Sequence, residues 1–304
     1  EDRLGHIAED WIGTVRFGVG DEAGSIEVAK HIAKGAVSRG PAFANDLAHL
    51  LLGWEMYDVA RPLAEFAATK LPGDLSAQYN LGIIRKLSGD WSGARESFQI
   101  VLQHREEDQS TLWNLGIVTT ALGDWPAARS AWSRLGFGLP AGEGDFGAEG
   151  ELTPVRLRSP SGVAEVIWGA RLCPARVRLK GIPCHVEWAC FDDDVLIDGV
   201  TTGEAVYDGK TLPIFNVLAV SKSAGRSRVG LKSDGPVSPM SLERLVHWLD
   251  EHQIPHGDWR NIGPRAPCSI ALAPKNEDEL SRWVSAIRTV HGDLGEWLSL
   301  DANE

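Results

Sequence analysis

Cysteine and histidine residues in the second half of the chain are the first candidates for chemistry, because both residue types bind zinc. They form two groups: His247, His252, His256 and Cys268, and Cys173, Cys184, His185 and Cys190. Neither group contains a Cys-x-x-Cys pair or a His-Glu-x-x-His motif. We therefore predict no metal and no cofactor. A metal-dependent enzyme or sensor built on these residues stays an alternative.

Basic side chains in the same half indicate a different chemistry, the binding of nucleic acid. They alternate along predicted strands: Arg156, Arg158, Arg176, Arg178 and Lys180. If these strands are neighbours, their side chains form one basic face of the kind that contacts phosphates. No aromatic residue alternates with them to stack on bases, and the net charge of the chain is −12, which disfavours nucleic acid. Nucleic-acid binding by this face is thus an alternative function, and pairing with acidic residues elsewhere in the chain is the competing interpretation.

Three consecutive aspartates, Asp192 to Asp194, precede a predicted strand. Consecutive side chains of a strand point in different directions, and the alternating ligands and glycine of a calcium loop are missing, so we predict a solvated turn. The chain has no Gly-x-Ser-x-Gly motif and no phosphate-binding loop. We predict that the protein is not an enzyme, and we leave the question open for its C-terminal half.

A repeat of 34 residues organises the first half of the chain. Seven positions recur at this offset: Leu81 and Leu115, Gly82 and Gly116, Gly89 and Gly123, Asp90 and Asp124, Trp91 and Trp125, Ala94 and Ala128, Phe98 and Trp132. A fixed period of this length predicts a solenoid in which each unit is one pair of helices.

The residue types at these positions fit two packed helices joined by a short turn. Gly82 and Ala94 allow two helices to approach closely, and we expect Phe98 and Trp132 to fill the space between successive pairs. Gly89 suits the left-handed residue after a helix. Asp90 suits the N-cap of the next helix.

The repeat resembles the tetratricopeptide repeat (TPR) family, in which Leu-Gly, Gly-Asp-aromatic, Ala and aromatic positions recur in this order. Leu75–Asp108 and Gln109–Leu139 are two copies, and Pro41–Asp74 is a looser third. The resemblance is confined to residues 41–139, and residues 150–304 resemble no family that we recognise. It implies an α-solenoid that binds a peptide or a protein in its concave groove.

The groove residues that the resemblance implies lie on the first helix of each copy. They are Tyr79, Asn80, Ile83 and Lys86, and one period later Trp113, Asn114, Ile117 and Thr120. Tyr79, Ile83 and Lys86 share one helical stripe, and in the family the Asn often hydrogen-bonds the backbone of an extended peptide. The cationic clamp of one subclass is absent, since its positions hold Asn45, His49, Ser110 and Asn114. An apolar or neutral segment is therefore the expected ligand, unless another helix of this chain fills the groove.

Beyond the repeats, the hydrophobic pattern changes from helical to alternating. We predict four parts: a helical repeat domain over residues 1–139, a Gly-rich acidic linker over 140–150, a β-rich, barrel-like unit of about six strands over 151–225, and an α+β segment over 226–304, which could form one unit with 151–225. Helices are expected over Leu4–Val15 and Ser25–Val37. Strands are expected over Leu152–Arg158 and over Asp194–Asp198, the latter ending at a Gly turn, and a hairpin is expected around Asp208-Gly209 with its first strand over Glu204–Tyr207.

The sequence contains no apolar run long enough for a membrane span. We expect a cytoplasmic protein of bacterial type. Glu1-Asp2-Arg3 does not begin a signal peptide, and whether a leader has been removed stays open.

These observations predict a non-catalytic adaptor that binds a protein or peptide partner in the TPR groove. They leave the partner and the oligomeric state undetermined. Replacement of both Trp113 and Asn114 by Ala is expected to weaken partner capture without unfolding the domain.

Overall fold

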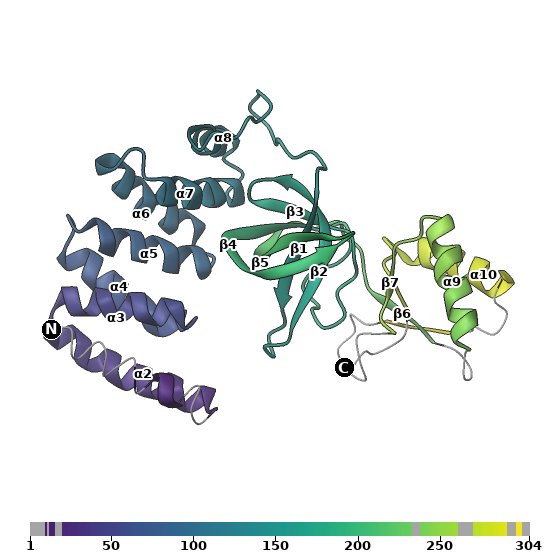
Figure 1. Ribbon diagram of the computed structural model, residues 1–304, viewed down its shortest axis with the longest axis horizontal. Coiled ribbons are helices and arrows are strands. Elements are labelled where there is room, and N and C mark those ends of the chain that lie inside the picture. Colours follow the sequence, from purple (N-terminus) through teal and green to yellow (C-terminus); the bar gives the residue numbers. More distant parts are fainter. Residues whose placement is uncertain are drawn as a thin grey trace. The chain divides into compact units, whose positions relative to one another are not determined.

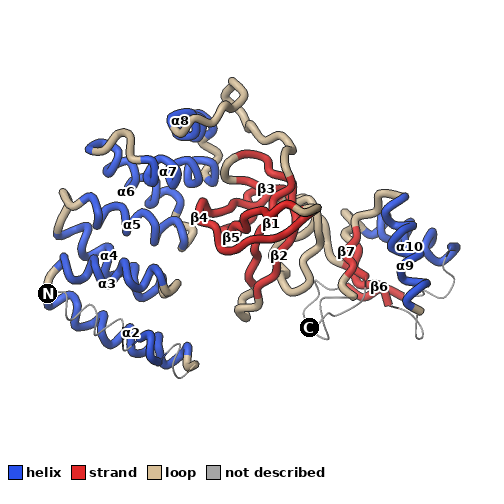
Figure 2. The backbone as a smooth tube through the Cα atoms, viewed as in Figure 1, coloured by secondary structure: helices blue, strands red, loops and turns tan. Residues whose placement is uncertain are grey.

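The computed structural model describes residues 10, 12–15, 20–232, 238–260, 270–290 and 296–299. The chain divides into two compact units, Glu1–Asp145 and Phe146–Glu304 (Figure 1). Within the described residues the first unit is helical and the second contains the strands (Figure 2). Most of the predicted helix over Leu4–Val15, as well as Cys268, lies outside the described residues.

Three consecutive helix pairs follow one another in the first unit, as Figure 1 shows. After α2 (Glu22–Ala36) and the short η2 (Val37–Arg39), the pairs are α3 (Pro41–Gly53) with α4 (Tyr57–Lys70), α5 (Leu75–Leu87) with α6 (Trp91–His104), and α7 (Gln109–Ala121) with α8 (Trp125–Arg134). Each pair coincides with one predicted copy of the repeat. The prediction of a TPR-like helical repeat region is therefore confirmed.

The turns between paired helices have the predicted chemistry. Gly89 and Gly123 adopt φ values of 77° and 68°, the left-handed region that favours glycine. The side chain of Asp90 accepts a hydrogen bond from the backbone N–H of Gly93, and that of Asp124 accepts one from Ala127. Both aspartates thus satisfy N–H groups that the first turn of a helix leaves without partners.

Two glycines of the repeat bring the helices of one pair together. A Cβ at Gly82 would lie 2.6 Å from Cε1 of Phe98, and a Cβ at Gly116 would lie 2.6 Å from Cζ2 of Trp132. The rings of Phe98 and Trp132 therefore fill space within a pair, where we had predicted them only between successive pairs. Phe98 also packs with Val118 of the next pair, as predicted. The contact within the pair was missed because the helical period fixes which face is apolar but not which neighbouring helices it meets.

Five strands of the second unit pair as a closed barrel in the order β1-β2-β3-β4-β5. They are β1 (Leu152–Arg158), β2 (Ala164–Cys173), β3 (Arg176–Leu179), β4 (Asp194–Tyr207) and β5 (Lys210–Lys222). Neighbouring strands are antiparallel except β1 and β5, which pair in parallel at Val155 with Phe215 and at Arg156 with Asn216. Residues such as Leu157, Val177 and Ile197 form the core of this barrel.

The structure has five strands in this region, and not about six, because β4 is continuous. The sequence pattern predicted the end of a strand at Asp198, before Gly199, and the start of another at Glu204. In the structure β4 continues through both positions, with shifts of register against β5. Such shifts, at β-bulges or other irregularities, interrupt the regular pairing without ending the strand. The predicted hairpin is confirmed, with φ values of 47° at Asp208 and 71° at Gly209.

Two charged side chains hold residues 181–193, which make up all but the first residue of the loop between β3 and β4. The carboxylate of Glu165 accepts hydrogen bonds from the backbone N–H groups of Cys184, His185 and Val186, at 2.8–2.9 Å. The buried guanidinium of Arg228 donates to the carbonyl oxygens of Pro183 and Val186, both at 2.9 Å. Local backbone pairing is thus replaced by side chains that are distant in sequence.

A second, four-stranded sheet follows the barrel, in the order β7-β8-β6-β9. Its elements are β6 (Val229–Lys232), α9 (Pro239–Glu251), β7 (His256–Asp258), β8 (Ile270–Leu272), α10 (Glu277–Val290) and β9 (Glu296–Ser299). Leu245 of α9 and Val284 of α10 belong to one buried cluster with Leu272. The indole N–H of Trp259 donates to the carbonyl of Ile182 at 3.1 Å, which connects this part to the loop of the barrel.

Among the described helices, none combines the length and the apolar character that crossing a bilayer requires.

Candidate partner-binding face

Polar side chains connect the first helices of the three repeats. Nδ2 of Asn80 on α5 donates to Oδ1 of Asn45 on α3 at 2.9 Å. Asn114 on α7 donates from Nδ2 to the hydroxyl of Tyr79 at 3.3 Å, and its Oδ1 accepts from Nζ of Lys86 at 2.8 Å. We call Asn45, Tyr79, Asn80, Lys86 and Asn114 the polar row. It fixes the relative positions of the side chains on α3, α5 and α7.

The eight predicted groove residues differ in burial. Tyr79, Ile83 and Trp113 are half-buried, whereas Asn80, Lys86 and Asn114 are buried within the polar row. Ile117 and Thr120 are 0% and 2% exposed. The hydroxyl of Thr120 donates to the carbonyl of Gly116 and accepts from the indole N–H of Trp132. As a correction, Ile117 and Thr120 are interior residues of the folded chain and are not available to a partner.

Trp113 is a packing residue of the last repeat. Its ring centroid lies 5.3 Å from that of Trp132 and 5.6 Å from that of Phe137, both in edge-on geometry. Asn114 is equally occupied, because Nδ2 also donates to the carbonyl of Ser110 at 2.8 Å. Replacement of both Trp113 and Asn114 by Ala would therefore remove internal contacts, so this double substitution is not the clean test that we expected from the sequence.

Asn80 differs from Asn114 in one respect that matters for binding. Its Nδ2 is bound to Asn45, but among the described residues its carboxamide oxygen accepts no hydrogen bond. Beside it on α5 are the half-buried side chains of Tyr79 and Ile83. This stretch of α5 offers one acceptor and two apolar surfaces, which suits the backbone and side chains of an extended segment.

The basic residues of the second unit are largely engaged within the chain. Arg178 pairs with Asp194 at 2.7 Å and with Glu149 at 3.2 Å, while Lys180 pairs with Glu149 at 2.9 Å and with Asp192 at 3.4 Å. The hydrogen bond from Lys180 holds the pKa of Glu149 below its ordinary value of 4.5. For Arg178 and Lys180 the structure thus agrees with the second interpretation of the sequence, in which the basic side chains pair with acidic residues and do not face nucleic acid.

The other members of the predicted basic face also have structural contacts. Arg176 is 2% exposed and its guanidinium lies over the ring of Phe146. Arg156 donates to the carbonyl of Thr202 at 2.6 Å, and Arg158 is exposed. The five residues do not present one uniform basic surface, so the structure gives no support to nucleic-acid binding by this face.

The three aspartates do not form a solvated turn. Asp193 is 4% exposed and accepts hydrogen bonds from the backbone N–H groups of Cys190 and Ala224, at 2.8 and 2.7 Å. Asp194 is 2% exposed and binds Arg178 through both carboxylate oxygens. The prediction was wrong because two of the partners, Arg178 and Ala224, lie 16 and 31 residues away and leave no local pattern.

No group of three or more potential metal ligands occurs among the described residues. Cys173, Cys184 and Cys190 are buried thiols. His247 lies 3.2 Å from Glu251, and Nδ1 of His252 is 2.8 Å from the carbonyl of Trp248. Cys184 and Cys190 belong to one buried apolar cluster, and Cys268 lies outside the described residues.

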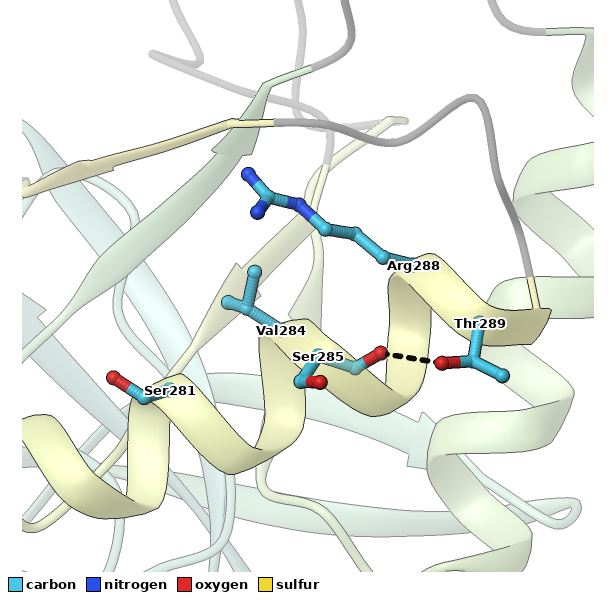
Figure 3. A pocket seen from close by; sticks show the side chains of 5 residues that line it. All are labelled: Ser281, Val284, Ser285, Arg288 and Thr289. Atoms are coloured by element: carbon cyan, nitrogen blue, oxygen red, sulfur yellow. Dashed lines mark hydrogen bonds between the residues drawn. The ribbon is translucent and has the colours of Figure 1, made fainter.

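An open hollow of about 400 Å³ lies along α10. Figure 3 shows its lining, Ser281, Val284, Ser285, Arg288 and Thr289. The hydroxyl of Thr289 donates to the carbonyl of Ser285 at 2.9 Å. The described lining contains hydroxyl groups and a guanidinium but no carboxylate or imidazole that could act as a general base.

Comparison with known proteins gives limited results. No protein-family model matches the chain, and no curated protein sequence matches it.

Among solved structures, one of MamA is 19% identical with a TM-score of 0.35, and covers 44% of this chain and 72% of its own. MamA from Desulfovibrio magneticus RS-1 is 18% identical with a TM-score of 0.32, and covers 41% and 68%. YrrB, described as a TPR protein with an unusual peptide-binding site, is 18% identical with a TM-score of 0.33. This chain spans 58% of the YrrB structure, which covers 36% of this chain.

Proposed function

We propose that this protein is a non-catalytic interaction protein, an adaptor whose TPR-like repeats bind an extended segment of a partner. The observation that carries the proposal is the surface of α5. There Asn80 has an acceptor oxygen with no bound donor among the described residues. Its neighbours on the helix, Tyr79 and Ile83, pack on the cluster of Phe98 and Val118 and are half-buried, so part of each side chain stays exposed. The oxygen can accept one backbone N–H of the partner, and the two side chains can contact apolar residues on either side.

The polar row favours binding because it holds this surface in place before a partner arrives. Asn80 is fixed by Asn45 of the preceding repeat, and Tyr79 by Asn114 of the following repeat. Side chains that are already ordered lose less conformational entropy on association. The absence of a cationic clamp at the positions of Asn45, His49, Ser110 and Asn114 supports an apolar or neutral segment as the ligand.

The test is selection of peptides from a displayed random library with the full-length chain, followed by affinity measurement on the selected sequences. Ile83→Ala should weaken binding by about 5–30-fold, since truncation of one apolar contact residue costs about 1–2 kcal/mol. Selected peptides should be apolar or neutral.

The matched control is Ile100→Ala on α6. Ile100 is also half-buried, belongs to the same repeat and lies on its second helix. It should leave the affinity unchanged while costing similar stability. If Ile83→Ala binds the selected peptides as tightly as Ile100→Ala, the surface of α5 is not the binding site.

A further inference from the structure

An arginine ladder connects the second helices of successive repeats. Nη2 of Arg61 on α4 lies 3.2 Å from Oδ2 of Asp90, the N-cap of α6. One period later, Nη1 of Arg95 on α6 lies 3.5 Å from Oδ2 of Asp124, the N-cap of α8. The arginines are offset by 34 residues, and so are the aspartates, so each repeat binds the next one through the same pair.

The ladder has a third arginine, Arg129 on α8, but no repeat follows it. One period after Asp124 the sequence has Arg158, in β1. Nε of Arg129 instead donates to the carbonyl oxygen of Pro140 at 2.8 Å. A main-chain acceptor from the segment after α8 thus takes the place that an N-cap aspartate has in the two earlier repeats.

The aromatic residues show the same replacement of a following repeat by the segment after α8. In the middle repeat Phe98 belongs to a cluster that includes Leu115 and Val118 of the next first helix, α7. In the last repeat the equivalent ring, Trp132, is covered by Phe137, with ring centroids 5.8 Å apart. Phe137 also contacts Trp113, and its backbone N–H donates to the carbonyl of Trp132. One side chain thus stands where a whole helix packs in the preceding repeat.

One group is left without a replacement. Tyr79 has its hydroxyl bound by Asn114 of the following repeat. Its equivalent one period later, Trp113, has a buried indole N–H that finds no hydrogen-bond partner among the described residues. The segment after α8 therefore reproduces the arginine and apolar contacts of a following repeat but not its polar row.

We propose that residues 135–140 form a strap that caps the C-terminal end of the repeat array in the place of a further helix pair. Terminal units of a solenoid need such a cover, because each unit buries its apolar face only against a neighbour. The first part of the segment that joins the two units thus belongs to the fold of the repeats, with Phe137 as its anchor.

The test is hydrogen–deuterium exchange of the full-length chain carrying Phe137→Ala. Loss of the two ring contacts should raise the exchange rate of backbone amides in α7 and α8 about tenfold or more. Because coupling in such arrays passes between neighbouring repeats, amides of α3 and α4 should keep their rates. Phe137→Leu, which retains apolar bulk, should give an intermediate increase in α8.

Leu122→Ala is the matched control. Leu122 lies at the end of α7 with 38% exposure, against 37% for Phe137, and has no place in the strap. It should change exchange in α8 by less than about twofold. The proposal is overturned if Phe137→Ala leaves α8 as protected as this control does, or if exchange rises uniformly from α3 to α8, because Phe137 would then not be a local cap.

Discussion

Replacement of Gly116 by Ala tests most directly how the repeats are held together. The site is the interior of α7, where Ala is ordinarily the better helix former by about 1 kcal/mol. The structure predicts the opposite result, because the added methyl group would meet Trp132. In this substitution the higher helix propensity of Ala favours the folded state, whereas the clash with Trp132 within the same repeat disfavours it.

The magnitude follows from the geometry of the contact. A Cβ at Gly116 would lie 2.6 Å from both Cε2 and Cζ2 of Trp132 and 2.8 Å from Cη2. The indole is fully buried, and its N–H is bound to Thr120, so it cannot move aside freely. Overpacking of this kind costs about 1–3 kcal/mol. Because three ring atoms lie within 2.8 Å of the added atom, we take the upper part of this range, about 2–3 kcal/mol. After the gain in propensity of about 1 kcal/mol, the expected net loss is about 1–2 kcal/mol.

Thermal unfolding followed by circular dichroism at 222 nm measures this loss, which should lower the midpoint by about 2–8 °C for a unit of this size. Gly35→Ala is the control. Gly35 lies in α2, and a Cβ there would meet no described atom within 4 Å beyond its chain neighbours and its own helix backbone. The same substitution should therefore be neutral or stabilising at Gly35. Equal or higher stability of Gly116→Ala relative to the parent chain would refute the packing argument.

A double substitution makes the test specific. Trp132→Leu removes the ring atoms that crowd the new methyl group, so Gly116→Ala should be less harmful in that background by about 1–2 kcal/mol. Trp132→Phe is not suitable for this test. In the preceding repeat the residue equivalent to Trp132 is Phe98, and a Cβ at Gly82 would lie as close to its ring, at 2.6 Å. Additive effects of the two substitutions would show that the methyl group and the indole do not interact.

Three further predictions concern single polar groups. Thr111→Val should raise the free energy of unfolding in denaturant by about 1 kcal/mol, because the buried Thr111 hydroxyl has no partner among the described residues; a loss would contradict this. The pKa of Glu149, measured by NMR titration, should lie below 4.5. It should rise towards 4.5 in Lys180→Met, because the hydrogen bond from Lys180 lowers it. The stabilising contact is complete above pH 4.5 and lost as the pH falls through the folded-state pKa, and an unchanged pKa in Lys180→Met would disprove the assignment. Asp193→Asn should destabilise the second unit by about 1–3 kcal/mol in the same denaturant assay, since Asn provides one acceptor for two backbone donors; an unchanged transition would count against it.

The repeat boundaries could be predicted because each is marked by several residues close together in sequence. Gly89 and Asp90, for example, end one helix and begin the next within two positions. The helical stripe of Tyr79 and Ile83 was predicted in the same way. The hydrogen bonds of the polar row could not be, because the partner of Asn114 lies 35 residues earlier, at Tyr79.

The second unit was less predictable because its structure depends on distant pairs. The β1 strand was predicted with its observed bounds, since alternation is a local signal. β7 and β9 have three and four residues, too few for a period to show. Asp193 and Arg178 were predicted to lie at the surface. The sequence around a single charged residue does not show which opposite charge or backbone group it binds in the folded chain.

The loop at residues 181–193 has a consequence for how the chain matures. Its backbone N–H groups bind Glu165, which lies 19–21 residues earlier in the chain. Its carbonyl groups bind Arg228, which lies 42–45 residues later. During synthesis the loop therefore leaves the ribosome when Glu165 has already been made but Arg228 has not. It reaches its final form only after β4, β5 and Arg228 have followed, which makes closure of the barrel end a late step dominated by long-range contacts.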